Sequence, residues 1–281
     1  MNCLRSLGSL VPLVALPLSV AGQGQEQDLA ELNKQLNNPL ASIWSIQFQN
    51  NTSLMSGDII ASTEVQNVLN FQPVLPVPMG SWTLISRPVF PIATLPNLDA
   101  ATLPDVDGHT TGLGDIALVT LAGPPLSGGW VFGFGPTFLL PTATDDRLGQ
   151  HKWQAGPAVV GVKLSQQWVI GGLLQQWWSF AGSDAYAATS QMNLQYFIQR
   201  LLPNAWQIGM TPNITVNWKA DEGNKLTLPV GLGVGKTTRL GKLPTKLLLE
   251  AQYALVRPDN YGQEWNFRFV ITPVFPNPLS R

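Results

Sequence analysis

The sequence predicts an all-β fold: a transmembrane antiparallel up-and-down β-barrel of about 12 strands with a short N-terminal helix. In residues 265–275, WNFRFVITPVF, nearly every second residue is apolar, and most of these are aromatic. Side chains alternate between the two faces of a strand, so the other face carries Asn266 and Arg268. Charged residues make up 12% of the chain, about half the share of a soluble domain. Trp occurs ten times, and beyond the N-terminus no apolar run reaches the length of a membrane helix.

Residues 1–21 are expected to be a cleaved secretory signal peptide. Arg5 supplies the positive charge, residues 7–18 form the apolar stretch, and Ser19-Val20-Ala21 is a small-x-small cleavage site. Cys3 precedes the apolar stretch, so a lipoprotein signal is not indicated and the mature chain would hold no cysteine. The chain then divides into the signal peptide (1–21), an N-terminal periplasmic helix or plug segment (22–39) and the outer-membrane barrel (40–281).

A short helix is expected over residues 26–36, because Leu29, Leu32 and Leu36 then share one face. Asn37-Asn38-Pro39 ends it. Two positions are open to this helix. It can rest against the periplasmic rim of the barrel, or it can plug the lumen.

After this helix, alternating apolar and polar residues predict twelve strands. They lie near residues 42–50, 66–77, 81–92, 113–122, 129–141, 153–164, 167–180, 190–200, 205–218, 225–235, 245–256 and 264–275. An even number places both ends of the barrel in the periplasm, as in bacterial outer-membrane barrels. Long connections rich in Asp, Asn, Thr and Gly are expected outside, and mostly short turns are expected inside.

The tryptophans support this number of strands. Trp44, Trp82, Trp130, Trp168 and Trp206 each begin an outward-running strand, whereas Trp153, Trp178, Trp218 and Trp265 lie at the opposite ends. Indole rings prefer the level of the lipid headgroups, because the ring is apolar and its N–H can stay hydrated. The spacing therefore predicts two rings of tryptophan, one at each membrane interface.

Polar side chains between the apolar ones are expected to face the lumen. The predicted pore-lining residues are Gln47, Gln49, Asn70, Gln72, Arg87, Asn193, Gln195, Asn213, Glu250, Gln252, Asn266 and Arg268. Residues 205–218 alternate most clearly: Ile208, Pro212 and Ile214 are expected to face lipid, and Asn213 the lumen. Placing an arginine of this set against lipid at the bilayer midplane would cost about 2–4 kcal/mol.

Seven prolines lie inside predicted strands: Pro73, Pro88, Pro136, Pro157, Pro212, Pro229 and Pro273. Each removes a backbone hydrogen bond and commonly implies a bulge. Pro73 and Pro88 lie on adjacent predicted strands, so their defects could coincide and let an apolar solute leave the lumen sideways into lipid. A pair of ordinary bulges with no opening is the alternative.

Several stretches match a known family. They are NPLASIWSIQFQNN (38–51), NFQPVLPV (70–77), LISRPVFPI (84–92), GLGDI (112–116), GPTFLLPTATDDRLGQHKW (135–153), WKADEGNKLTLPVGLGVGK (218–236) and YALVRPDNYGQEWNFRFVITPVFP (253–276). In these the chain resembles the outer-membrane proteins grouped under the MetA pathway of phenol degradation, often labelled simply as transporters. The resemblance covers nearly all of the mature chain, and in-strand prolines belong to the family pattern. It implies a barrel for the uptake of small aromatic or hydrophobic compounds, broadly similar to the channels that open sideways into the membrane, and it marks no substrate residues.

Two glycine-rich stretches imitate nucleotide-binding loops. Residues 112–117, GLGDIA, match G-x-G-x-x-A, but a long loop precedes them and a strand follows, whereas a dinucleotide site needs a strand before and a helix after. Residues 231–238, GLGVGKTT, lack the phosphate-loop spacing because Val230 stands where a glycine is required. With a net charge of −1, no nucleic-acid partner is indicated either.

Both histidines are expected in outer loops. His151 follows Asp146, and His109 follows Asp105 and Asp107. An Asp–His pair could activate water, and the two aspartates could help to bind calcium. We interpret all of them as solvated loop residues, because no G-x-S-x-G motif or strand-spaced Ser–His pair accompanies them. No catalytic residue, metal or cofactor is therefore predicted.

The predicted function is that of a channel in the outer membrane of a Gram-negative bacterium, passing small, hydrophobic or aromatic molecules inward without energy input. The expected partners are outer-membrane lipid, the barrel-assembly machinery acting on the C-terminal strand, and the solute. Two alternatives stay open: a surface barrel with hydrolytic activity in its loops, and a structural barrel with a closed lumen.

Overall fold

The computed structural model describes residues 20–41, 43–99, 101–124 and 128–275 of the 281-residue chain. These residues form the helix α1 (Val20–Leu36), a short 3-10 helix η1 (Asp146–Leu148) and fourteen strands. The strands are β1 (Trp44–Ser56), β2 (Glu64–Met79), β3 (Trp82–Pro96), β4 (His109–Leu113), β5 (Ile116–Gly123), β6 (Trp130–Leu140), β7 (Lys152–Leu164), β8 (Trp168–Gly182), β9 (Ser190–Leu201), β10 (Trp206–Met210), β11 (Asn213–Asn217), β12 (Leu226–Leu240), β13 (Leu243–Val256) and β14 (Gly262–Phe275).

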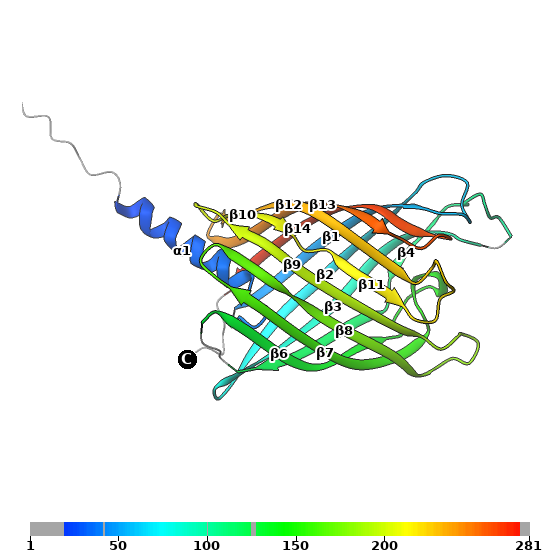
Figure 1. Ribbon diagram of the computed structural model, residues 1–281, viewed down its shortest axis with the longest axis horizontal. Helices are drawn as coiled ribbons and strands as arrows, with labels where there is room; N and C mark the ends of the chain where they lie inside the picture. Colours follow the sequence, from blue (N-terminus) through cyan, green and yellow to red (C-terminus); the bar gives the residue numbers. More distant parts are fainter. Residues whose placement is uncertain (1–19, 42, 100, 125–127, 276–281) are drawn as a thin grey trace, which may run out of the picture.

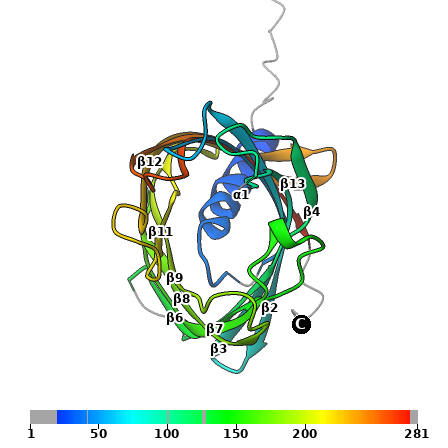
Figure 2. The ribbon, with the colours of Figure 1, turned by 90° about the vertical axis from the view of Figure 1, so that its right-hand side faces the viewer.

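The strands form a closed antiparallel barrel, which Figure 1 shows from the side and Figure 2 along its axis. β14 closes it by pairing with β1, with Phe275 opposite Trp44. Two spans are interrupted: β4 and β5 both pair with β3, and β10 and β11 both lie between β9 and β12. The strands therefore make twelve spans, and the predicted closed 12-strand antiparallel barrel with a short N-terminal helix is confirmed.

The two ends of the barrel differ. α1, the start of β1 and the end of β14 lie at one end, which we call the terminal mouth; the opposite end is the loop mouth (Figure 1). The described connections at the loop mouth are residues 57–63, 97–99, 101–108, 141–151, 183–189, 218–225 and 257–261. Those at the terminal mouth are residues 80–81, 124, 128–129, 165–167, 202–205 and 241–242. Longer connections thus gather at one mouth, as expected for an outer-membrane barrel.

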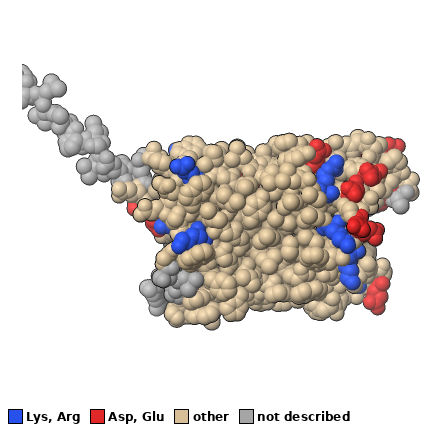
Figure 3. Space-filling view, viewed as in Figure 1, with Lys and Arg blue, Asp and Glu red and all other residues tan. Residues whose placement is uncertain are grey.

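The outer surface carries an apolar band around the middle of the barrel. Leu232 and Leu249, each in the middle of its strand, are 64% and 59% exposed. On the face seen in Figure 3, charged side chains gather at the two ends and the band between them is free of them. A soluble protein would leave this surface facing water, whereas lipid matches it. No helix among the described residues is long and apolar enough to cross a membrane.

Tryptophans flank the band at both mouths. Exposed at the terminal mouth are Trp82, Trp130, Trp168 and Trp206, and exposed at the loop mouth are Trp153, Trp178, Trp218 and Trp265. Trp44 is half-buried, and its indole N–H donates to the Pro76 carbonyl oxygen at 3.2 Å. Lys163 and Lys236 lie 4.9 and 4.7 Å from the ring centres of Trp130 and Trp206, respectively. Rings and cations therefore mark the rim of the terminal mouth.

Toward the terminal mouth one side of the interior is apolar, although a polar interior was predicted throughout; toward the loop mouth β6, β7 and β8 carry the buried polar residues Thr137, Gln154 and Gln175. The apolar cluster is Leu40, Ile85, Val119, Leu121, Ala158, Val160, Val162, Val169 and Leu173, from the N-terminal segment, β3, β5, β7 and β8. Buried polar side chains line the opposite wall, on β1, β13 and β14. Strands of the apolar side carry apolar residues on both faces, so alternation is weak there. One side of the barrel is thus packed like a protein core.

The predicted strand 205–218 is not continuous. Thr211 and Pro212 lie outside both β10 and β11, and pairing with β12 is absent from the position after Gly209 until Thr215. Pro212 is fully buried, so its predicted position facing lipid is wrong. Proline has no N–H to donate to the ladder. The backbone N–H and carbonyl groups of Thr211 form hydrogen bonds with side chains inside the lumen instead.

Bulges explain few of the in-strand prolines. Among the described strands, the register shifts between Leu54 and Met55, between Trp153 and Gln154, and between Leu228 and Pro229. Only the last involves one of the seven prolines, so a bulge accompanies one of these prolines rather than most of them. At the others the neighbouring pairs keep one register, because a missing donor opens the ladder locally without adding a residue.

The N-terminal helix begins at Val20, earlier than the predicted residue 26, and ends at Leu36 as expected. Of the predicted signal peptide, residues 1–19 lie outside the described part of the chain. α1 contacts β12 and β13 at the terminal mouth, and its C-terminal end lies within the ring of strands when viewed along the axis (Figure 2).

Candidate functional site

The lumen contains two successive hollows. A vestibule of about 870 Å³ lies at the loop mouth, and a smaller inner cavity of about 160 Å³ lies toward the terminal mouth. On β9, Asn193 lines the vestibule and Gln195, the next inward residue, lines the inner cavity. The two hollows therefore lie one after the other along the barrel axis.

All twelve predicted lumen residues lie on the inner face. Gln47, Gln49, Arg87, Gln195 and Arg268 line the inner cavity, and Asn193 lines the vestibule. The other six pair with residues of the set or with each other: Asn70 opposite Gln49, Gln72 opposite Gln47, Asn213 opposite Gln195, Glu250 opposite Arg268 and Gln252 opposite Asn266. Directly opposed residues of antiparallel strands share a face, which places these six inside as well.

A buried ion pair closes the break in the wall between β10 and β11. Arg268 Nη1 lies 3.7 Å from Glu250 Oε2, and both residues are 3% exposed. Glu250 accepts the Thr211 backbone N–H at 2.8 Å and the Thr211 hydroxyl at 2.8 Å. Arg268 donates to the Thr211 carbonyl oxygen at 2.6 Å. These side chains satisfy the backbone groups that the β12 ladder leaves unpaired at Thr211.

Glycines on β12 let Glu250 cross that strand. Gly231, Gly233 and Gly235 face inward between β13 and the break. A Cβ at Gly231 would lie 2.9 Å from Glu250 Oε1, and one at Gly235 would lie 2.9 Å from Gln207 Cγ. The stretch that imitates a phosphate loop in the sequence thus makes room for a buried carboxylate.

Amides continue the polar wall on both sides of the ion pair. Arg268 Nε donates to Asn51 Oδ1 at 3.0 Å, and Asn266 Nδ2 donates to Gln252 Oε1 at 3.0 Å. Gln49 lies on the same face and accepts from the side-chain amide of Gln47 at 3.0 Å. The wall offers both donors and acceptors to a solute.

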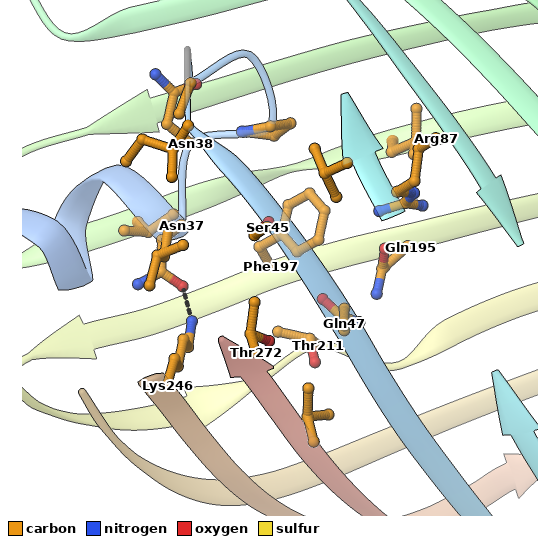
Figure 4. Close-up of a pocket in the computed structure, with 18 of the residues that line it drawn as sticks. Asn37, Asn38, Ser45, Gln47, Arg87, Gln195, Phe197, Thr211, Lys246 and Thr272 are labelled. Atoms are coloured by element: carbon orange, nitrogen blue, oxygen red, sulfur yellow. Dashed lines mark hydrogen bonds between the residues drawn. The ribbon is translucent and has the colours of Figure 1, made fainter. Parts of the chain in front are cut away.

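Arg87 stands apart from this network. It lies on the inner face of β3 and lines the inner cavity, which Gln195 of β9 also lines (Figure 4). Its Nε has no exposed surface and no hydrogen-bond partner among the described residues. Within the same residues Arg87 forms no ion pair.

Lys246 is a third cation on the inner face, and it was not among the predicted lumen residues. It is 8% exposed and lines the inner cavity. Its position on β13 follows from period two, since it lies four residues before Glu250 and therefore on the same face. Arg87, Lys246 and Arg268 line the cavity and no carboxylate does, whereas Glu250 is engaged behind it by Thr211 and Arg268.

The same lysine anchors the segment that follows α1. Lys246 Nζ donates to Asn37 Oδ1 at 2.6 Å, shown dashed in Figure 4, and Asn37 Nδ2 donates to Gln207 Oε1 at 3.0 Å. One turn earlier, Thr237 Oγ1 donates to Asn33 Oδ1 at 2.9 Å, and Asn33 is 1% exposed. The end of α1 is thus tied to the terminal mouth by buried polar contacts.

Leu40 carries this segment into the apolar side of the lumen. A Cβ at Gly123 or Gly133 would lie 2.6 or 2.9 Å from Leu40 Cδ1, so these glycines form a notch for the leucine side chain. Residues 35–39 line the inner cavity together with Ala41 and Ile43. Of the segment 22–39, predicted to be a periplasmic helix or a plug, residues 35–39 line the lumen, and they include the last two residues of α1.

The two proline candidates for a lateral gap lie opposite each other. β2–β3 pairing stops after Phe71–Phe90 and resumes at Leu75–Ser86 in one register, which brings Pro73 and Pro88 face to face in the unpaired stretch. Arg87 belongs to this stretch. The interruption therefore adjoins the inner cavity.

The β2–β3 interruption differs from the pairing around a second pair of opposed prolines. Pro136 and Pro157 are directly paired within an otherwise continuous β6–β7 ladder. Their missing donors fall on the outer sides, where the β5–β6 and β7–β8 pairings have interruptions. Between Pro73 and Pro88 the interruption lies in the ladder that they share.

The vestibule is narrowed by residues 141–151. Asp115, which lies between β4 and β5, accepts the backbone N–H groups of Ala143 at 3.2 Å and Gln150 at 2.7 Å. Leu148 is 8% exposed and lines the vestibule. The GLGDI and PTATDDRLG stretches are therefore joined in one structure at the loop mouth.

Two titratable side chains that line the vestibule, Arg147 and Tyr261, have raised pKa values. Arg147 Nη2 lies 3.1 Å from Asp99 Oδ2, and this hydrogen-bonded contact raises the pKa of Arg147. Burial raises the pKa of Tyr261 to about 12, with a further contribution from the charge of Glu64. Both groups keep their protons at neutral pH.

Each histidine contacts a neighbouring group at the loop mouth. His151 Nε2 lies 3.7 Å from Asp146 Oδ1, and its ring stacks on Tyr186 with the ring centres 3.9 Å apart. His109 Nε2 lies 3.1 Å from the Val65 carbonyl oxygen. Among the described residues, no group of three or more His, Cys, Asp or Glu side chains is placed to hold a metal ion.

No family model and no curated protein matches the chain. Among solved structures, an outer membrane channel from Pseudomonas putida F1 matches with a TM-score of 0.64 and 15% identity, over 83% of this chain and 96% of that one. The β domain of the Bordetella autotransporter BrkA (TM-score 0.41, 13% identity, 83% and 100% covered) and outer membrane phospholipase A from Escherichia coli (TM-score 0.41, 9% identity, 84% and 90% covered) also match. The first likeness is one of fold: this chain has the fold of an outer-membrane β-barrel channel.

Proposed function

We propose that this barrel is a passive outer-membrane channel for small, mainly aromatic or hydrophobic molecules, with the loop mouth outside and the terminal mouth toward the periplasm. The observation that carries the proposal is the succession of a wide vestibule and a narrow, half-apolar cavity inside one closed barrel. A barrel serving only as a surface scaffold has no need of a lumen with one apolar and one polar wall. Ligand sites with a mainly apolar lining and a few placed polar groups suit this class of solute.

The sequence resemblance to outer-membrane proteins of the phenol-degradation group supports the solute class. The apolar outer band and the aromatic side chains of β14 support membrane lipid and the barrel-assembly machinery as partners. Trp265, Phe267 and Phe269 are 38%, 48% and 40% exposed along that closing strand. Outward aromatic residues at alternate positions are what such a strand offers to lipid.

The exit of the solute has two candidate routes. One passes along the lumen past Asn37 and Leu40 into the periplasm. The other passes sideways through the interruption between Pro73 and Pro88, which would spare an apolar solute the aqueous periplasm. The interruption lies beside the inner cavity, and this position supports the lateral route.

Swelling of lipid vesicles that contain the refolded protein tests the channel. A monosaccharide, a phenyl glycoside and a trisaccharide serve as neutral solutes, and protein-free vesicles are the control. We expect the first two to enter faster with the protein than without it, and the trisaccharide to be excluded by the inner cavity. Equal entry rates with and without the protein for all three solutes would contradict a channel and favour a structural barrel with a closed lumen.

A further inference from the structure

We propose that the inner cavity binds a small aromatic carboxylate, a single ring with one acidic group, with the carboxylate on Arg87 and the ring on the apolar wall. The proposal rests on the proposed channel function for its role in transport, and it narrows the solute class from neutral hydrophobic compounds to their acids. Binding itself requires only the geometry of the cavity.

The charge of the cavity points to an anion. Arg87, Lys246 and Arg268 line it, and Glu250, the acidic partner nearby, is engaged by Arg268 and Thr211. Arg87 and Lys246 therefore have no carboxylate partner among the described residues. Cations kept in a narrow lumen of low polarity select for anions.

The position of Arg87 favours a carboxylate over a spherical ion. Arg87 lines the cavity and forms no ion pair among the described residues, and the Gln47 and Gln195 side chains line the same cavity (Figure 4). A planar guanidinium donates two parallel hydrogen bonds to a carboxylate, and amide N–H groups can add to them. Lys246 already donates to Asn37 at the other end of the cavity.

The wall and the volume favour a single ring. The cavity that Arg87 lines is also lined by the apolar residues Ile85, Val119, Leu173 and Phe197, and Val119 lies directly opposite Arg87. Its volume of about 160 Å³ is close to that of an apolar protein cavity of roughly 150 Å³ that holds benzene. A second fused ring would have to displace the residues that follow α1.

Equilibrium binding to the refolded full-length chain in detergent tests the proposal, with benzoate and benzyl alcohol as probes and calorimetry as the readout. The two probes share ring and size, and only benzoate is charged. We expect benzoate to bind at least tenfold more tightly than the alcohol. Arg87→Gln should weaken benzoate at least tenfold, Arg87→Lys should weaken it less, and Arg200→Gln, which changes an exposed arginine on the outer face, should leave it unchanged.

Heat-modifiable gel mobility shows which variants are folded. If Arg87→Gln does not fold, Phe197→Ala serves instead and should weaken both probes. Equal affinity of the wild type for benzoate and benzyl alcohol, or unchanged benzoate affinity in folded Arg87→Gln, would overturn the proposal. Vesicle swelling without benzoate binding would support the channel and contradict this binding site. Benzoate binding without swelling would support the binding site and contradict the channel.

Discussion

At the scale of single residues, the lumen separates compensated charges from uncompensated ones. Glu250 and Arg268 neutralise each other while they satisfy the backbone of Thr211. Arg87 and Lys246 face the inner cavity without a carboxylate partner among the described residues. Glu250 and Arg268 therefore stabilise the wall, whereas Arg87 and Lys246 determine the electrostatic potential of the inner cavity.

Removing one member of the buried pair should destabilise the barrel. Glu250→Gln leaves the Arg268 guanidinium buried without its counter-charge, which typically costs about 3–5 kcal/mol. We expect the low end, because lumen water can reach part of the site. Urea unfolding in lipid vesicles, followed by tryptophan fluorescence, measures it, with Glu222→Gln in an exposed loop as the matched control. Equal midpoints for the two variants would refute the role of the pair.

The uncompensated cations should set ion preference. Arg87→Gln removes a positive charge from the inner cavity and should shift the reversal potential toward cations in a salt gradient. Arg200→Gln removes the same charge from the outer face and should not. A reversal potential that Arg87→Gln leaves unchanged in an open channel would show that ions do not pass this residue.

At the scale of elements, the effect of a proline depends on which strand pairing loses the hydrogen bond that a backbone N–H at this position would donate. Pro136 and Pro157 oppose each other across a continuous pairing, whereas Pro73 and Pro88 oppose each other across an interrupted one. Thr211 and Pro212 interrupt a third place, which the Glu250–Arg268 pair closes. No such side-chain closure was found for the β2–β3 interruption among the described residues.

Restoring donors at that interruption tests the lateral route. Pro73→Val with Pro88→Val should complete the β2–β3 ladder, stabilise the barrel and slow the uptake of an aromatic solute into lipid vesicles. Pro136→Val with Pro157→Val is the matched control, and it should not change uptake. Wild-type uptake in the first double variant would show that solutes do not leave between β2 and β3.

The two faces of the strands should respond oppositely to charge. Leu249→Arg places a charge in the middle of the outer apolar band, at a cost of about 2–4 kcal/mol near the bilayer midplane. Asn213→Arg places the same side chain on the inner face and should be tolerated. The fraction of each variant that shows heat-modifiable mobility after refolding measures this difference. Equal refolding would mean that the assignment of faces is incorrect.

At the scale of the whole molecule, the sequence predicted the architecture because lipid imposes a strict pattern on the outer face. Tryptophan spacing and alternation sufficed for twelve spans and for the inward side of Gln49, Arg87 and Arg268. The inner surface obeys no such rule, so its apolar side was missed. Pro212 was placed against lipid because alternation cannot show that the strand breaks at this residue. Period two could have found Lys246, but a lysine near a strand end also fits the outer rim.

The N-terminal segment is positioned to control the terminal mouth. Lys246→Met removes the hydrogen bond to Asn37 and should loosen the residues that line the inner cavity. We expect a higher open probability in single-channel recordings than for the wild type. Lys236→Met, which removes an outward lysine over Trp206, should leave gating unchanged. Identical open probability in the wild type and Lys246→Met would argue against this segment as the gate.

Single-channel recording of the refolded wild-type chain in a planar bilayer tests the central claim most directly. A passive channel predicts discrete current steps that reverse with the applied voltage, with a small conductance set by the inner cavity, and larger or longer steps in Lys246→Met. A bilayer that stays silent with correctly folded wild-type and Lys246→Met protein would contradict the channel and favour a barrel with a closed lumen.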